Sequence, residues 1–274
     1  MLRTPFVFVV LSASGCELVA NIQDLHLTTD ASIGDGGAPV DAPDEDDATQ
    51  VADASDGATN DVEDAGIVTE LIDDMEANNG LILATKGRSG AWFTYNDGTA
   101  TGTQTPTAGG PFLPSMIQPP RGSSNYAART WGSGFTTWGA GMGFNVNDPP
   151  SGPNKDQRST YDASGYAGFV FWARIGSADA GAATSVRFNV PSKDTDPAGG
   201  VCSPVSACSD YFGVTLSLSD TWTMYVIEFT DMHQEGWGQP VASFDASTMY
   251  GCEFKVDQNK TFDVWIDDIA FLLP

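Results

Sequence analysis

From residue 67 onwards, the chain is a succession of short runs in which apolar and polar residues alternate, separated by Gly, Asn, Asp and Pro. Alternation with a period of two is typical of half-buried β-strands, and no stretch has the 3.6-residue repeat of an amphipathic helix. All seven Trp and all seven Tyr also lie beyond residue 66. Residues 67–274 therefore predict one all-β domain, a sandwich or barrel that is long enough for a single core.

We expect strands at 67–77, 81–85, 90–95, 125–131, 134–146, 165–175, 184–190, 210–218, 221–229, 248–257 and 261–272. Because successive side chains of a strand point to opposite faces, the runs SVRFNV, YFGVTLSL and TFDVWIDD each have an inward and an outward set. The predicted inward residues are Val186, Phe188, Val190, Phe212, Val214, Leu216, Phe262, Val264 and Ile266. The predicted outward residues include Arg187, Asn189, Tyr211, Asp263 and Trp265.

The segment before this domain is strongly acidic. Residues 17–64 contain 14 Asp and Glu, and no Lys or Arg occurs between Arg3 and Lys86. Such a segment has too few large apolar side chains to offset the entropy of ordering, so residues 16–66 predict a disordered acidic linker. The formal net charge of −24 and the lack of a basic stripe argue against a nucleic-acid partner.

The first residues, MLRTPFVFVVLSASGC, contain one positive charge, a short apolar run and small residues before Cys16. This arrangement predicts a secretory signal peptide over residues 1–15, and the run is too short to span a bilayer. The stretch from Ala13 to Cys16 resembles the lipobox of bacterial lipoproteins. That resemblance implies a lipid on Cys16, a membrane partner and a place in the bacterial cell envelope, at the outer membrane or cell surface. An ordinary signal peptide with an incidental cysteine is the alternative.

Export also permits disulfides. Cys202 and Cys208 frame a Pro- and Ser-containing loop whose five intervening residues can close into a disulfide. Cys252 alternates with Phe254 and Val256, which predicts a buried thiol.

Five motifs follow one another in the order LIDDMEANNG, GFVFWARIG, SVRFNV, TWTMYVIEF and TFDVWIDDIAF. Over about residues 70–273 this order resembles the jelly-roll carbohydrate-binding modules of the galactose-binding-like superfold, and it is most similar to family 11. The resemblance implies a β-sandwich jelly roll that binds polysaccharide, a β-glucan in particular, without catalysing a reaction. We expect the protein to be a monomer.

In those jelly rolls the first and last strands lie side by side, and a structural calcium is commonly held by acids from both. Carried over to this chain, the resemblance implies Ca²⁺ bound by Asp74, Glu76 and Asp268. Carboxylate and carbonyl oxygens are the ligands that calcium prefers. The alternative is that Asp73, Asp74, Asp267 and Asp268 lie on an exposed edge or turn.

Carbohydrate modules stack aromatic rings on the C–H faces of sugars and satisfy the sugar hydroxyls with polar side chains. Trp237, flanked by glycines in the loop 231–240, is expected to project from the domain. Trp172 and Trp265 are also candidates for sugar stacking. The alternative for each is a structural role in which the ring covers the outside of the sandwich. The predicted carbohydrate-binding residues are Trp172, Arg187, Asn189, Tyr211, Gln234, Trp237, Glu253, Asp263 and Trp265.

No catalytic motif is recognisable. The domain has one histidine, His233, and none of its glutamates falls in the E-x-D-x-E pattern of jelly-roll glucanases. A glycosidase needs two placed carboxylates, and the sequence does not indicate such a pair. The alternatives to a binding module are a compact glucan hydrolase on the same fold and an envelope module for protein–protein adhesion.

Overall fold

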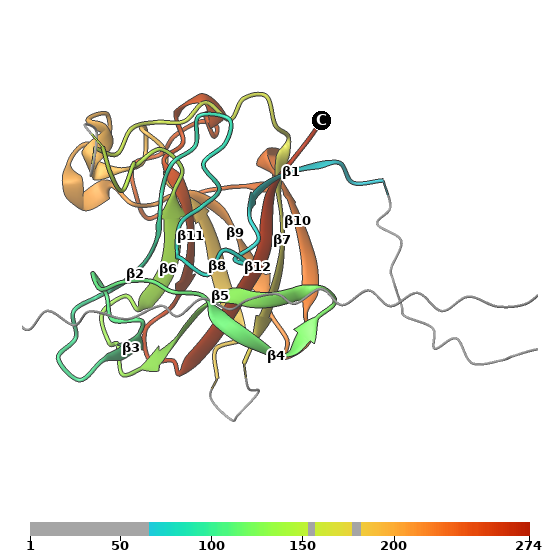
Figure 1. Cartoon of the computed structure of the whole chain (residues 1–274). Helices are drawn as coiled ribbons and strands as arrows, with labels where there is room; N and C mark the ends of the chain where they lie inside the picture. Colours follow the sequence, from blue (N-terminus) through green and yellow to red (C-terminus); the bar gives the residue numbers. More distant parts are fainter. Residues whose placement is uncertain (1–65, 153–156, 177–181) are drawn as a thin grey trace, which may run out of the picture. The chain divides into compact units, whose positions relative to one another are not determined.

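In the computed structural model, residues 66–152, 157–176 and 182–274 are described, and their strands form two antiparallel sheets that pack into a sandwich (Figure 1). The seven-stranded sheet contains β1 (Thr69–Asp73), β3 (Thr103–Thr105), β4 (Ser115–Arg121), β5 (Ser124–Ser133), β7 (Gly168–Ile175), β10 (Thr223–Glu228) and β12 (Phe262–Leu272). The five-stranded sheet contains β2 (Trp92–Asn96), β6 (Ala140–Asn145), β8 (Ser185–Val190), β9 (Phe212–Ser217) and β11 (Gly251–Val256). Short 3₁₀ helices lie at η1 (Pro197–Gly199), η2 (Val205–Ala207), η3 (Phe229–Asp231) and η4 (Ala246–Thr248).

The chain crosses repeatedly between the two sheets. Strand β2 leaves the sheet of β1, β6 leaves that of β5, and from β9 to β12 each strand lies in the other sheet from the one before it. This connectivity confirms the predicted all-β jelly-roll sandwich. Within the described residues, no helix is long and apolar enough to cross a membrane. The expected signal peptide, Cys16 and the acidic linker lie outside the described residues.

Two strands were not expected from the sequence. Strand β3 is very short, and β4 contains Pro119 and Pro120. Proline cannot donate to a strand ladder, and β4 pairs only with β5, at the margin of the sheet. The strand expected at 81–85 is reduced to a single bridge between Leu81 and Ala91.

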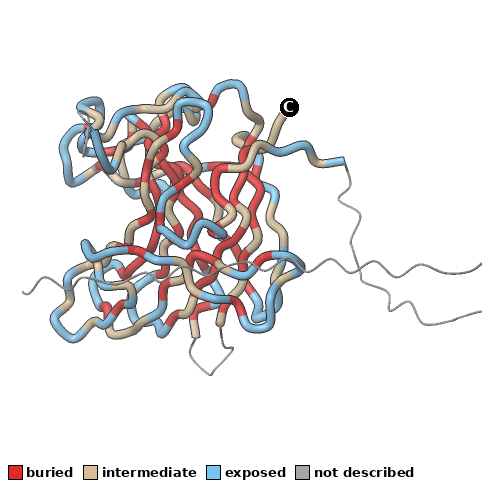
Figure 2. The backbone as a smooth tube through the Cα atoms, in the orientation of Figure 1, coloured by how far each residue is buried: buried red, intermediate tan, exposed pale blue. Residues whose placement is uncertain are grey.

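The core lies between the sheets, and the buried residues run along the middle of the strands while the loops are exposed (Figure 2). Phe169 and Phe171 of β7 meet Phe188 of β8 with ring centroids 5.3 and 5.1 Å apart. Phe254 of β11 packs edge-on against Phe171 at 5.2 Å. These rings interdigitate between the two sheets, as in other sandwiches.

Strand β12 pairs with three other strands. Its first half pairs with β5, its second half with β1, and both halves with β7 on its other side. The first and last strands of the domain, β1 and β12, are therefore side by side (Figure 1). Thr69 lies opposite Leu272. This adjacency is the one that the family resemblance implied.

The acids Asp267 and Asp268 lie at a β-bulge in β12. The register with β7 shifts between Asp267 and Ala270, and Asp268 has a left-handed φ of 45°. A bulge inserts one extra residue and reverses the alternation of the side chains beyond it. As a result, Ile266 and Ile269 both point into the core although they are an odd number of residues apart.

Asp267 is fully buried, and its charge is compensated by Arg121 of β4. Arg121 donates to Asp267 from Nε (3.2 Å) and Nη2 (2.9 Å), and it also pairs with Asp268. The Ser124 hydroxyl donates a further hydrogen bond of 2.7 Å. Desolvation raises the pKa of Asp267 to about 6 against the lowering effect of Ser124 and Arg121. A guanidinium therefore occupies the position where a metal cation was expected.

The residues of the predicted calcium site have other partners in this structure. Glu76 is taken up by the backbone amides of Asn125 (2.7 Å) and Tyr126 (2.9 Å), and Asp268 by Arg121. The Asp74 carboxylate accepts from the Glu76 amide at 3.1 Å. Within the described ranges, no group of three or more His, Cys, Asp or Glu side chains is arranged to hold a metal ion. In this arrangement hydrogen bonds and Arg121 engage these carboxylates, so the described residues give no support to Asp74, Glu76 and Asp268 as joint ligands, and the calcium site stays a prediction.

Arg121→Met should lower the free energy of unfolding by about 3 kcal/mol at pH 7, since it leaves the Asp267 carboxylate buried without its counter-charge. The loss should shrink as the pH falls towards about 6, because the buried Asp267 carboxylate takes up a proton in the folded state, and at higher pH when Arg121 is absent. Urea unfolding followed by tryptophan fluorescence would measure both effects.

Lys86→Met is the matched control. Its ammonium group lies 3.6 Å from Glu70 on the surface, so it should cost less than about 1 kcal/mol. If calcium instead raises the Tm of the wild type and Asp268→Ala abolishes that rise, the ion-pair interpretation is wrong and a calcium site exists.

Candidate functional site

A groove with a volume of about 980 Å³ crosses the outer face of the five-stranded sheet. Strands β2, β8 and β11 supply its floor, and the loops before β6, before β9, after η3 and after β11 supply its walls. The lining residues are Tyr95, Thr137, Trp138, Asn189, Ser209, Tyr211, Glu235, Trp237, Glu253, Lys255, Asp257 and Gln258.

Two glycines of β6 keep the floor low. In the strand register, Gly141 lies between Tyr95 and Lys255, and Gly143 lies beside Glu253. A Cβ on Gly141 would lie 2.6 Å from the Tyr95 ring, and one on Gly143 would lie 3.1 Å from Cγ of Glu253. The side chains of Tyr95 and Glu253 can therefore lie across β6, and only glycine leaves the space for them.

Glu253 is the most perturbed acid of the groove. Desolvation raises its pKa, and the nearby Asp196 carboxylate adds to this effect, whereas Tyr95, Arg158 and Lys255 lower it; the net result is a pKa of about 7. The Tyr95 hydroxyl lies beside this carboxyl but finds no partner of normal hydrogen-bond geometry within the described part of the chain. The floor therefore holds a carboxyl group that can accept or donate a hydrogen bond near neutral pH.

Two indole rings line the groove from opposite edges of the sheet. Trp138 is 40% exposed and stacks on Tyr95 with ring centroids 5.9 Å apart. Trp237 is 56% exposed and belongs to a loop whose His233 bridges to β9. Strands β11 and β8 separate β6 from β9, so the two rings belong to loops next to strands that are not neighbours in the sheet.

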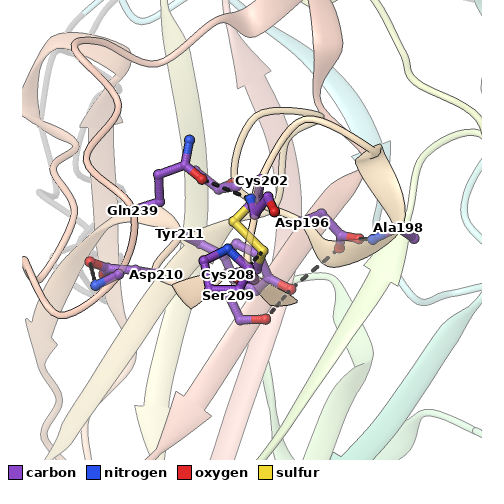
Figure 3. The surroundings of a disulfide bond; sticks show 12 residues. Asp196, Ala198, Cys202, Cys208, Ser209, Asp210, Tyr211 and Gln239 are labelled. Atoms are coloured by element: carbon purple, nitrogen blue, oxygen red, sulfur yellow. Dashed lines mark hydrogen bonds between the residues drawn. A yellow bond between two sulfur atoms is a disulfide. The ribbon is translucent and has the colours of Figure 1, made fainter. Parts of the chain in front are cut away.

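The Trp237 loop is fastened next to a disulfide. Cys202 and Cys208 form the disulfide that their spacing predicts, and Cys252 is a buried free thiol, as expected. Gln239 bonds to both ends of the disulfide loop: its amide donates to the Ala207 carbonyl (2.7 Å), and its Oε1 accepts from the Ser203 amide (2.8 Å) (Figure 3). The disulfide loop and the Trp237 loop therefore support one wall of the groove together.

Four predicted binding residues line the groove together: Asn189, Tyr211, Trp237 and Glu253. Tyr211 donates to Asp196 at 3.3 Å, close to the disulfide (Figure 3).

Two further predicted residues lie behind the groove and support it. Arg187 is buried and donates to Asn189 (3.3 Å) and to the His233 carbonyl. Gln234 donates to the Asp210 and Gln239 carbonyls and accepts from the Val241 amide, so it organises the Trp237 loop.

The other three predicted residues, Trp172, Asp263 and Trp265, lie on the opposite side of the sandwich. They belong to β7 and β12 of the seven-stranded sheet, whose outward face is not the groove face. Trp265 is only 5% exposed, because Ile117 of β4 packs over it. The expectation that these residues share one surface with Asn189 and Glu253 was therefore wrong.

On that opposite face, arginines and tryptophans form an alternating ladder. Asp263 supports it by accepting from Arg129 at 2.8 and 2.7 Å. The ladder contacts are Arg121 with Trp172 (4.7 Å) and Trp222 (5.6 Å), Arg174 with Trp222 (5.1 Å) and Trp265 (4.7 Å), and Arg129 with Trp265 (4.3 Å) and Trp131 (4.3 Å).

Sequence reasoning did not single out Trp138 or Tyr95 as binding residues. Trp138 is in phase with the buried residues of β6, but Gly139, with φ 109°, reverses the direction of the chain between them. Tyr95 could have been found, since in WFTYN it alternates with the buried Trp92 and Thr94.

Glu253→Gln should change how stability depends on pH. With a folded-state pKa of about 7 against an ordinary value of 4.5, ionisation of Glu253 destabilises the fold, so the stability it contributes is lost as the pH rises from about 4.5 to 7. The variant should gain about 2 kcal/mol relative to the wild type over this range, allowing for solvent in the groove. Urea titrations at pH 4.5 and 8 would measure the gain, and an equal difference at both values would contradict it.

No protein-family model matches this chain, and a search of curated proteins finds no match. Solved structures of similar fold include the family 11 carbohydrate-binding module of a cellulosomal cellulase of Clostridium thermocellum, which is 12% identical, with a TM-score of 0.46 over 77% of this chain and 97% of that one. The same family's module in complex with a β-1,3-1,4-mixed-linked tetrasaccharide is 12% identical, with a TM-score of 0.44 over 76% and 96% of the two chains. A family 30 module is 13% identical, with a TM-score of 0.38 over 61% and 86%.

Proposed function

We propose that the domain binds polysaccharide in the groove of the five-stranded sheet and does not cleave it. The observation that carries this proposal is the pair of exposed rings, Trp138 and Trp237, at opposite edges of a polar floor. Indole faces stack on the apolar C–H faces of sugars, and Asn189, Lys255 and Glu253 can satisfy hydroxyls between them. Two rings beside strands that are not neighbours in the sheet suit a chain of several sugars better than a monosaccharide.

Among polysaccharides we propose an uncharged one, with a β-glucan as the first choice. The lining contains three acidic side chains, Glu235, Glu253 and Asp257, and one ammonium group, Lys255, which already pairs with Asp257 at 3.3 Å. Acidic sugars would meet like charge there, at a cost that the low dielectric of the floor increases. The β-glucan follows from the resemblance of the motif order to family 11.

One observation favours the hydrolase alternative. A carboxyl group with a pKa of about 7 has the property that a general acid needs, and Glu253 shares the groove with Glu235 and Asp257. Glycoside hydrolysis requires a second carboxylate at a defined separation on the other side of the scissile bond. Activity measurements therefore belong in the first test of the binding function.

Trp138→Ala and Trp237→Ala should each weaken polysaccharide binding by about 1–3 kcal/mol, by analogy with base–aromatic stacking, while leaving the domain folded. Both rings are exposed, so their removal leaves no buried cavity. Affinity gels containing mixed-linkage glucan, xylan or galactan would show the loss as faster migration.

Trp265→Ala is the control, because this ring is buried among Ile117, Ala127 and two arginines. It should destabilise the domain by about 3–5 kcal/mol and alter binding only through unfolding. If no polysaccharide retards the wild type and the purified protein releases reducing sugar, the hydrolase alternative replaces the binding function.

We also propose that Cys16 carries a lipid and that the acidic segment after it separates the domain from a membrane of the cell envelope. The lipobox-like stretch before Cys16 and the 14 acids of residues 17–64 support this proposal.

Cys16→Ser should move the protein from the membrane fraction to the soluble fraction, because the acyl chains would have no thiol to attach to. Fractionation of cells that express either form would show the difference. A wild-type protein already soluble after export would rule out the lipid anchor.

A further inference from the structure

The loops that carry the two exposed tryptophans are built in the same way. In each loop the tryptophan is followed by a glycine, Gly139 or Gly238, and the backbone amides around the ring converge on one aspartate. The aspartates, Asp97 and Asp210, come from different parts of the chain, one just after β2 and the other just before β9. Two segments that are distant in the sequence therefore share one arrangement, in which an aspartate accepts hydrogen bonds from the backbone amides of a tryptophan loop.

Asp97 holds the Trp138 loop. Its Oδ2 accepts from the amides of Thr137 (2.8 Å), Trp138 (3.0 Å) and Gly139 (3.1 Å), and its Oδ1 accepts from the Thr99 amide at 2.9 Å. Desolvation raises the pKa of this carboxyl, but the hydrogen bonds from Thr99, Gly139 and Thr137 outweigh it and hold the pKa below its ordinary value. The carboxylate is therefore ionised, and hydrogen bonds to an ionised acceptor are the stronger kind.

Asp210 holds the Trp237 loop. Its Oδ1 accepts from the Glu235 amide (2.8 Å), and its Oδ2 accepts from the amides of Gly236 and Gly238 (2.9 Å each). The side chain of Asp210 is buried, whereas Trp237 is exposed. The Trp237 ring is thus exposed to solvent, while the backbone of its loop is held by hydrogen bonds to the buried Asp210 side chain.

The glycines let both loops lie close to neighbouring residues. A Cβ on Gly238 would overlap Cβ of Asp210, and one on Gly139 would overlap the carbonyl oxygen of Val256. Gly139 also has a φ of 109°, which L side chains rarely adopt. Glycine is needed at these positions, but it also leaves the backbone free to move. The hydrogen bonds to Asp97 and Asp210 restrict that freedom in the folded loops.

We propose that Asp97 and Asp210 are the positioning residues of the groove, each holding one tryptophan ring so that the two rings stack on different sugars of the same polysaccharide chain. This inference rests on the proposed binding function. Neither aspartate lines the groove, so each acts through its own tryptophan rather than on the ligand. Restricting the loops before the ligand arrives removes part of the entropy that binding would otherwise lose.

The test is a crossed set of double-mutant cycles with a mixed-linkage β-glucan oligosaccharide as the probe, measured by isothermal titration calorimetry. Asp210→Asn should weaken binding at least about fivefold in the wild type and have no further effect in Trp237→Ala. Asp97→Asn should behave in the same way with Trp138→Ala. Each aspartate variant should keep its full effect when the other tryptophan is removed.

Asp245→Asn is the matched control. Asp245 also accepts a backbone amide, that of Ser247 at 3.0 Å, but it caps η4 and does not line the groove. Its binding should equal that of the wild type. Equal losses from Asp210→Asn in the presence and absence of Trp237 would overturn the proposal, because Asp210 would then act on the groove as a whole.

A second measurement needs no ligand. Acrylamide quenching of the Trp237 signal, taken as the difference from Trp237→Phe, should increase in Asp210→Asn and stay unchanged in Asp97→Asn. If quenching rises as expected but no glucan binds, the polysaccharide function fails while the positioning of the ring stands. If Asp210→Asn leaves the quenching unchanged, the positioning role is wrong whatever the glucan does.

Discussion

The ion pair between Arg121 and the two acids of β12 is the interaction on which the seven-stranded sheet depends. Strand β12 is the partner of β1, β5 and β7, so the ends and the middle of the domain meet along it. The bulge at Asp268 brings Ile266 and Ile269 into the core and leaves the Asp267 carboxylate fully buried. A buried carboxylate without a cation would be among the most costly groups in the domain. Arg121 supplies that cation and also ties β4 to the sheet.

The same sheet explains why the molecule has two different outer faces. On the side of the seven-stranded sheet, tryptophan and arginine side chains fill the surface and contact one another, and Ile117 of β4 covers Trp265 in a small second core. On the side of the five-stranded sheet, Gly141 and Gly143 leave the surface open. Aromatic side chains therefore contribute to packing on one face and are free to meet a ligand on the other.

Alternation within a strand was predictable from the sequence, and with it the core positions and the outward direction of Asn189, Glu253 and Trp265. The sheet to which each strand belongs was not predictable in the same way, because it is decided by pairing between distant segments. Trp265 and Glu253 thus point outward from opposite sheets. The family resemblance assigned a cation to Asp268, but the cationic partner seen here, Arg121, is 146 residues away from Asp267 and lies in a segment whose two prolines argued against a strand.

Anchoring by Asp97 and Asp210 also determines whether the two tryptophan loops lose conformational entropy on folding or on ligand binding. Glycine-rich segments lose more freedom on ordering than other segments do. Asp97 and Asp210 fix the loops in the free protein, so the conformational entropy is lost when the domain folds. The ligand then binds to rings that are already ordered. Ordering the loops therefore lowers folding stability and raises ligand affinity. Other parts of the domain must stabilise the fold enough to offset this loss.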